Sequence, residues 1–121
     1  METTPLSTHD MGDIGEDLAA EYLLSKGYSV VCRKYRSKKG EIDCIVKDVD
    51  GTLVFVEVKA ANSTAFGNPL LWITPSKQRT IIRMAQQYLF EHRIQSVRCR
   101  FDVIAILKGN VTHIKNAFPA G

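Results

Sequence analysis

The chain has 121 residues, of which 45% are hydrophobic and 24% charged, a length and composition that fit one globular domain able to fold alone and exclude a two-domain enzyme. Its 16 Lys and Arg residues exceed its 13 Asp and Glu residues, and the formal net charge of +3 permits a polyanionic partner without requiring one. We expect residues 1–9 to be a flexible N-terminal lead and residues 10–121 to form the single domain.

The cysteines and the N-terminal segment indicate the cellular compartment in which the protein is expected. Cys32, Cys44 and Cys99 stand far apart and form no C-x-x-C pair, which argues against a disulfide scaffold and a zinc ribbon. No stretch approaches the roughly 18 apolar residues of a membrane span, and the N-terminus lacks a basic segment followed by an apolar one. We therefore predict a soluble cytoplasmic protein with no membrane partner and with reduced thiols in its core.

The first predicted elements are a helix and a strand. From Met11 to Lys26 apolar residues recur every three or four positions, and Gly27 supplies a C-cap. Residues 28–36 are rich in β-branched and aromatic side chains, which favours a strand, and the polar residues 37–40 form a turn.

Residues 41–60 give the strongest local signal of the chain. Two strand-like runs flank residues 48–51, and Gly51 can adopt the positive φ that a hairpin loop requires. The segment therefore predicts two adjacent antiparallel strands.

The second half of the chain predicts a helix and two more strands. Thr74 is a suitable N-cap, and Pro75 is the residue favoured at the first helical position of a helix that extends to about His92. Strands follow at 97–107 and 111–117. The order αβββαββ predicts an α/β sandwich, and we expect Trp72 to be part of its core.

The register of the central hairpin predicts a cluster of charged side chains. If the loop is residues 49–51, Asp43 lies opposite Glu57 and Glu41 opposite Lys59, and strand alternation directs all four side chains to one face. Facing carboxylates repel each other unless a cation lies between them. The available donors are carboxylate oxygens, water and a backbone carbonyl, that of Val58, which suit Mg²⁺ or Mn²⁺ rather than Zn²⁺.

A simpler interpretation of Glu57 and Lys59 is a solvated ion pair on an exposed strand, worth at most about 1 kcal/mol. An E-x-K tripeptide alone occurs by chance in very roughly four in ten chains of this length. Residues 53–56 and Val58, however, are apolar and lie on both sides of the strand, which predicts a central strand with both faces covered. Charged groups there lose hydration, and this context favours the metal site.

Several motifs resemble a known family. G-E-I-D at 40–43, followed by V-F-V-E-V-K at 54–59, resembles the divided active-site motif of PD-(D/E)xK nucleases. The segments at 15–20, 100–103 and 113–118 (G-E-D-L-A-A, R-F-D-V and H-I-K-N-A-F) resemble the YraN-like family, small predicted endonucleases similar to Holliday-junction resolvases. The resemblance implies a restriction-endonuclease-like sandwich, with a central mixed β-sheet flanked by helices, and a Mg²⁺-dependent endonuclease that acts on DNA, including branched or otherwise structured DNA.

The resemblance also assigns roles by position. It implies that Asp43 and Glu57 are metal ligands, that Lys59 lies near the attacking water, and that Glu16 reaches the metal directly or through water. Glu16 lies on a helix side made of small and apolar residues, but an ordinary first-turn acid favoured by the helix dipole is an equally open interpretation. The role expected of Glu41 is secondary, namely to orient Lys59.

Basic residues before the site are candidates for contacts with the DNA backbone. Five of them occur within the segment 33–39: Arg33, Lys34, Arg36, Lys38 and Lys39. The alternative is that cations at a strand edge discourage aggregation. Lys77 is a further candidate, since it lies near a predicted helix N-terminus, which attracts phosphate.

Two functions remain open. The first is the metal-dependent nuclease, and the second is a non-catalytic module on a nuclease scaffold that binds nucleic acid or another partner. Symmetric nicking by a resolvase needs two sites, so a homodimer is expected for that subclass. The three histidines have no metal-ligand spacing, and Arg100 and Asp102 are expected to form an ion pair beneath the site.

Overall fold

The computed structural model describes residues 8–61 and 72–120, and its elements follow the predicted order. The elements are α1 (Thr8–Ser25), β1 (Ser29–Ser37), β2 (Gly40–Lys47), β3 (Leu53–Ala61), α2 (Pro75–Glu91), β4 (Cys99–Leu107) and β5 (Asn110–Ile114). Helix α1 begins at Thr8, so the last two residues of the predicted lead are helical, whereas residues 1–7 lie outside the described residues.

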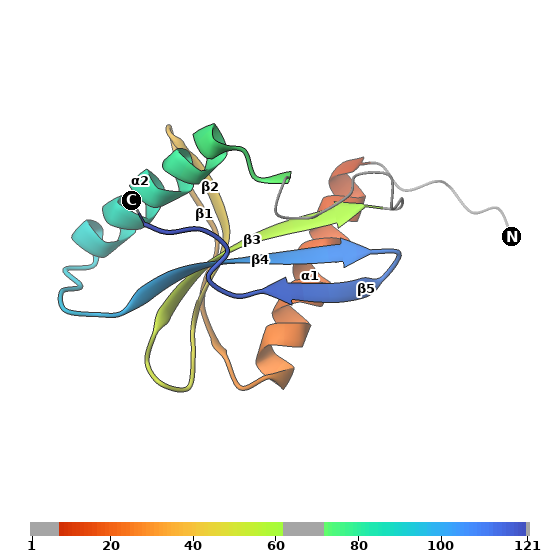
Figure 1. Cartoon of the computed structure of the whole chain (residues 1–121), viewed down its shortest axis with the longest axis horizontal. Coiled ribbons are helices and arrows are strands. Elements are labelled where there is room, and N and C mark those ends of the chain that lie inside the picture. The colour runs from red at the N-terminus through yellow and green to blue at the C-terminus, as the bar shows by residue number, and fades with distance from the viewer. Residues whose placement is uncertain (1–7, 62–71, 121) are drawn as a thin grey trace, which may run out of the picture.

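The five strands form one mixed sheet in the order β1-β2-β3-β4-β5. Strands β3 and β4 are parallel, because α2 connects them as a crossover, and the other neighbours are antiparallel. The two helices pack on opposite faces of the sheet (Figure 1). The predicted sandwich, a central mixed sheet flanked by helices in the order αβββαββ, is confirmed.

Each helix buries its own apolar cluster against the sheet. Ala19 and Leu23 of α1 pack on Val54 and Val56 of β3, and the opposite cluster joins α2 to residues such as Phe55 of the same strand. Strand β3 is therefore covered on both faces, as its sequence predicted. Within the described residues, no helix combines the length and apolar character that crossing a membrane requires.

Local sequence signals fix the element ends. Gly27 has φ +91° and ends α1, and Thr74 caps α2 by accepting a hydrogen bond from the Lys77 N–H at 3.1 Å. In the hairpin, the Asp48 N–H donates to the Thr52 carbonyl at 2.9 Å, and Gly51 has φ +89°. The predicted three-residue loop is therefore confirmed.

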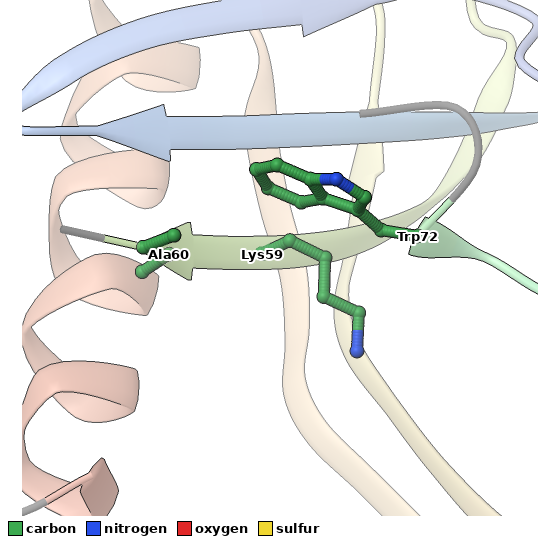
Figure 2. A pocket seen from close by; sticks show the side chains of 4 residues that line it. Lys59, Ala60 and Trp72 are labelled. Carbon is green, nitrogen blue, oxygen red and sulfur yellow. The ribbon is translucent and has the colours of Figure 1, made fainter. Parts of the chain in front are cut away.

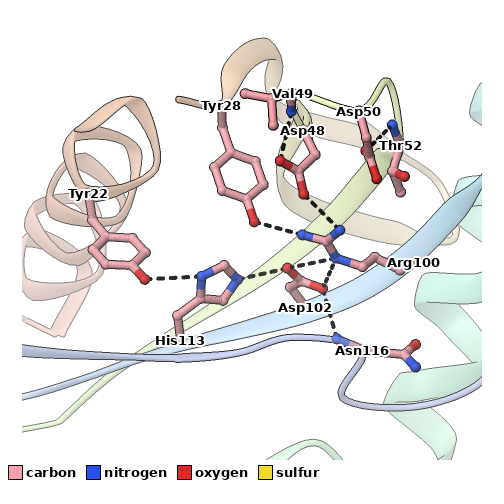
Figure 3. Close-up of polar contacts among 10 residues, drawn as sticks. All are labelled: Tyr22, Tyr28, Asp48, Val49, Asp50, Thr52, Arg100, Asp102, His113 and Asn116. Atoms are coloured by element: carbon pink, nitrogen blue, oxygen red, sulfur yellow. Dashed lines mark hydrogen bonds and ion pairs between the residues drawn. The ribbon is translucent and has the colours of Figure 1, made fainter. Parts of the chain in front are cut away.

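A buried polar network holds the end of the sheet near the 48–52 loop (Figure 3). The predicted ion pair between Arg100 and Asp102 is present, with Nε and Oδ1 3.0 Å apart. The guanidinium also donates to Asp48 Oδ2 at 2.9 Å and to the Tyr28 hydroxyl at 2.7 Å. Because these partners belong to the hairpin loop and the segment after α1, the network extends toward the loop and not beneath the acidic residues.

His113 belongs to this network, which the sequence analysis did not predict. Its Nε2 lies 2.7 Å from Asp102 Oδ2, and its Nδ1 lies 3.2 Å from the Tyr22 hydroxyl of α1. Asp102, 1% exposed, also accepts the Asn116 N–H at 3.0 Å. Burial alone would raise the pKa of Asp102, yet hydrogen bonds from His113, Asn116 and Arg100 hold it below its ordinary value.

The prediction that all three cysteines are core thiols is wrong for Cys99. This residue is exposed because it is the first residue of β4, ahead of the buried part of that strand. Cys32 is half-buried on the edge strand β1, and only Cys44 is fully buried. Burial raises the pKa of the Cys44 thiol to about 11.

Candidate active site

Strands β2 and β3 separate at the predicted acidic residues. Their pairing follows the predicted register from Lys47↔Leu53 to Cys44↔Val56 and then ends. Beyond that pair, β1 and β2 turn toward the N-terminal end of α2, whereas β3 continues beside β4 (Figure 1). Asp43 lies where the strands diverge, and its Oδ2 accepts the Val58 N–H at 2.7 Å in place of a backbone partner.

Strand alternation is broken at Asp43. Ile42 and Ile45 both pack in the cluster beneath α2, although residues three positions apart on a regular strand face opposite sides. The register of β1 and β2 places Lys34 opposite Asp43, but these two residues are not paired, and Lys34 has φ +55°. The prediction that four charged side chains leave one face is therefore wrong, because the kink turns Asp43 into the gap between β2 and β3.

The acidic side chains nevertheless meet in one cavity. Carboxylate oxygens of Glu16, Glu41 and Asp43 lie within 4.8 Å of one another. Asp43 is also hydrogen-bonded to Glu57, which is 5% exposed. The cavity has a volume of about 220 Å³ and is lined by Glu16, Glu41, Asp43, Glu57, Val58, Lys59, Ala60 and Lys77.

Helix α1 brings Glu16 to this cavity because the helix approaches β3 closely. A Cβ at Gly15 would lie 2.9 Å from the Ala60 Cβ, so only glycine permits this distance. The Glu16 side chain is 15% exposed, whereas that of Asp17 is 66% exposed. Of the two interpretations left open for Glu16, its low exposure supports the inward-facing one, and its role as a metal ligand stays a prediction.

Two carboxylate oxygens in the cavity lack hydrogen-bond donors. Glu16 Oε2 and Glu57 Oε2 are buried without a hydrogen bond to a described residue, and their cationic neighbours, Lys34 Nζ and Lys77 Nζ, lie at 3.6 and 3.5 Å. A buried carboxylate without donors is costly, and a cation relieves this cost. Since every side-chain acceptor is an oxygen, the residues fit Mg²⁺ or Mn²⁺.

The acidic cavity changes the ionisation of its carboxyl groups. Burial, the hydrogen bond to Glu57 and the charge of Glu57 raise the pKa of Asp43 to about 8. Burial and the charge of Asp43 also raise the pKa of Glu16. Without a cation, Asp43 is thus expected to be protonated at neutral pH, and metal binding should release its proton.

This pKa predicts how the stability of the metal-free protein changes with pH. The folded protein binds the Asp43 proton more tightly than the unfolded chain, so the free energy of unfolding should fall by a few kcal/mol as pH rises from about 4 to about 8. Asp43→Asn removes the titrating group and should be more stable than wild type at pH 8. Urea unfolding across this range in metal-free buffer measures the difference.

The control for this experiment is Glu21→Gln, which changes an exposed acid on the same helix as Glu16. Its stability should follow that of wild type at every pH. If Asp43→Asn also followed wild type between pH 4 and 8, Asp43 would titrate normally and the account of the cavity would be wrong.

Lys59 extends from β3 into the acidic cavity and also borders a second one. Together with Ala60, Ala61 and Trp72 it lines an apolar cavity of about 340 Å³. Figure 2 shows the Trp72 indole beside the base of the Lys59 side chain, whose amino group points away from the ring. Trp72 is half-buried at this opening, so its predicted place in the core is wrong.

Glu41 has a different partner from the one predicted. Its Oε2 accepts a hydrogen bond from Arg36 Nε at 2.9 Å, since Arg36 and Glu41 are directly paired across the β1–β2 turn. Among the described residues, no ion pair joins Glu41 to Lys59. The short turn at 37–40, already visible in the sequence, was the signal for this pair.

The predicted basic segment divides into two groups. Arg33 donates to Asp17 at 2.7 Å, and Lys34 donates to Asp13 at 2.9 Å, so acids of α1 offset both charges. Lys38 and Lys39 are exposed and form no ion pair with a described residue. Lys77, predicted only as a DNA contact, lines the acidic cavity itself.

Comparisons with known proteins identify relatives along most of the chain. The family profile described as "Uncharacterised protein family UPF0102" matches residues 15–106, which include the acidic residues of the cavity and Lys59. A UPF0102 protein of Persephonella marina is 48% identical over 107 residues, covering 88% of this chain and 91% of that protein. A UPF0102 protein of Prosthecochloris aestuarii is 46% identical over 123 residues, covering 93% of this chain and 96% of that protein.

Among solved structures, similarity is weaker. The EndoMS-dsDNA2 complex matches with a TM-score of 0.40 and 17% sequence identity, covering 84% of this chain and 38% of that chain. The chain described here thus spans well under half the length of EndoMS.

Proposed function

Because this chain belongs to the uncharacterised protein family UPF0102, the YraN-like family that its motifs predicted, we propose that it is a divalent-metal-dependent nuclease that hydrolyses phosphodiester bonds in DNA. One observation carries the proposal. Four carboxylates from α1, β2 and β3 meet in a single cavity beside Lys59, and two of their buried oxygens lack a hydrogen-bond donor.

Asp43 and Glu57 would hold Mg²⁺ or Mn²⁺, together with the Val58 carbonyl and with Glu16 directly or through water. When bound, such an ion neutralises charge on phosphate oxygens and lowers the pKa of water. The hydrogen bond from the Val58 N–H fixes Asp43 Oδ2, and the other carboxylate oxygen would become available to the ion once the proton shared with Glu57 is released. Metal ligands held by neighbouring groups in this way keep their geometry.

Lys59 would stabilise the negative charge that develops on the phosphate. Its position in the cavity beside Asp43 and Glu57 would bring its positive charge to the phosphate, and we assign it this electrostatic role rather than that of a general base. Lys77 lies at the same cavity and would contact a neighbouring phosphate oxygen once its distance to Glu57 increases.

The family resemblance to Holliday-junction resolvases extends the proposal to branched or otherwise structured DNA. A four-way junction has two symmetric strands to cut, so a protein that resolves it would act as a homodimer with one cavity in each subunit. Flapped DNA, in contrast, has one cut site and needs only a monomer.

The alternative function is a non-catalytic module that binds nucleic acid or another partner on a nuclease scaffold. The observation that favours it is the position of Lys34 and Lys77, whose amino groups lie 3.6 and 3.5 Å from the buried oxygens of Glu16 and Glu57. Ammonium groups at these positions offset part of the charge that a metal would neutralise.

Cleavage of end-labelled linear, flapped and four-way DNA decides between the two functions. The nuclease should cut at least one of these substrates with Mn²⁺ or Mg²⁺ and none of them with EDTA. Lys59→Ala is the matched variant and should cleave the same substrate far more slowly than wild type. DNA binding without cleavage of any substrate by the wild-type protein would establish the non-catalytic alternative.

A further inference from the structure

A further cavity, of about 390 Å³, lies between the β1–β2 turn and helix α2 and is lined by Lys39, Thr80 and Arg83. We propose that Lys39 and Arg83 bind a backbone phosphate of the DNA strand, roughly two to three nucleotides from the phosphodiester that lies in the acidic cavity. This inference rests on the proposed function and specifies how that substrate is held.

The turn is held firmly against α2, which fixes the position of Lys39. A Cβ at Gly40 would lie 2.9 Å from Thr80 Cγ2, so the backbone of the turn approaches the helix as closely as glycine allows. Ser37 Oγ donates to Met84 Sδ at 3.0 Å and accepts the Lys39 N–H at 3.0 Å. The backbone that carries Lys39 is therefore fixed against α2, so that binding a phosphate would have to order only the two cationic side chains.

The charge at this cavity is not offset by nearby acids. Helix α2 has no Asp or Glu before Glu91, its last residue, whereas Lys77, Arg79 and Arg83 all lie in its first half. Among the described residues, neither Lys39 nor Arg83 forms an ion pair. This contrasts with Arg33, whose charge is offset by Asp17, and a cation without an acidic partner binds phosphate with less competition.

Thr80 lines the site but contributes no hydrogen-bond donor to a phosphate. Its hydroxyl donates to the Ser76 carbonyl at 3.2 Å, and its methyl group contacts the turn at Gly40. The phosphate contacts would therefore come from two long cationic side chains. An arginine and a lysine together bind a phosphodiester through charge and through the donors of the guanidinium.

The separation of Lys77 and Arg83 along α2 fits one DNA strand. Lys77 lines the acidic cavity, and Arg83 follows it by six residues, about 9 Å along α2 at 1.5 Å per residue. With 3.4 Å of helix axis per nucleotide, this length corresponds to roughly two to three nucleotides. The strand would thus run along the N-terminal half of α2 from one cavity to the other.

DNA binding measured by fluorescence anisotropy with EDTA, where no cleavage occurs, tests the site. Lys39→Ala/Arg83→Ala should raise Kd for a short duplex by about tenfold and lower the slope of log K against log salt by about 1.8, as expected for two lost phosphate contacts. The control is Lys47→Ala/Lys115→Ala, which removes the same net charge at exposed positions away from both cavities. Its Kd should change less than twofold.

The outcomes separate this inference from the proposed function. Equal Kd and salt slope for the two double variants would overturn the phosphate site, even if wild type cleaves DNA and Lys59→Ala does not. Displacement of the duplex by inorganic phosphate at constant ionic strength would identify a general anion site and would overturn the DNA assignment. Thermal unfolding of each variant shows whether it is folded.

Discussion

Lys59→Ala is expected to lower the rate of Mn²⁺-dependent DNA cleavage by about 10²–10³-fold, the usual effect of removing one group that stabilises transition-state charge. The ammonium group extends from β3 into the cavity that Asp43 and Glu57 share, and among the described residues it forms no ion pair. Its charge is therefore available to a phosphate. Single-turnover cleavage of the best substrate of the panel measures this rate.

Two further variants show whether the loss is due to charge. Lys59→Met keeps most of the side-chain length without the ammonium group and should be as slow as Lys59→Ala. Lys47→Ala removes an exposed lysine from the other end of β2 and should cleave like wild type. If Lys59→Ala cleaved DNA at the wild-type rate, the activity would belong to another site or to a contaminating nuclease.

Asp102→Ala is expected to lower the free energy of unfolding by about 3–5 kcal/mol at pH 7, because it leaves half-buried Arg100, His113 and the Asn116 N–H without the acceptor they share. Asp102 accepts hydrogen bonds from Arg100, His113 and the Asn116 N–H, which join β4 to β5 and to the segment after β5. Urea unfolding monitored by circular dichroism measures the loss.

The pH dependence of this variant provides an independent check. The pKa of Asp102 is lowered in the fold, so its contribution is present above the ordinary aspartate pKa and is lost as pH falls through the lowered value. The difference between wild type and Asp102→Ala should therefore shrink in strong acid. Glu21→Ala, at an exposed position of α1, should change stability by less than about 0.5 kcal/mol. A similarly small effect of Asp102→Ala would show that the network does not stabilise the fold.

Features that depend on short-range signals were predictable from the sequence. Gly51 fixed the length of the hairpin loop, and with it the register that places Val54 opposite Val46. The Thr74-Pro75 pair marked the start of α2. The small and apolar residues on one side of α1 identified Glu16 as the inward-facing acid, because helical periodicity alone determines which residues share a side.

Features that depend on packing between distant segments were not predictable. The kink at Asp43 coincides with a positive φ at Lys34, a residue type that gives no local signal for this conformation. The approach of Lys77 to Glu57 depends on where α2 lies over the sheet. Likewise, Arg33 appeared free for DNA because its partner, Asp17, is 16 positions away on a helix that packs beside β1.

The central claim is that the carboxylates around Asp43 bind a divalent cation. Isothermal titration calorimetry with Mn²⁺ tests it most directly, with wild type compared with Asp43→Ala. We expect wild type to bind Mn²⁺ with proton release, which makes the measured heat depend on the ionisation enthalpy of the buffer, and we expect Asp43→Ala to bind at least about tenfold more weakly. No binding heat from wild type in any buffer, or equal affinities of the two proteins, would contradict the claim.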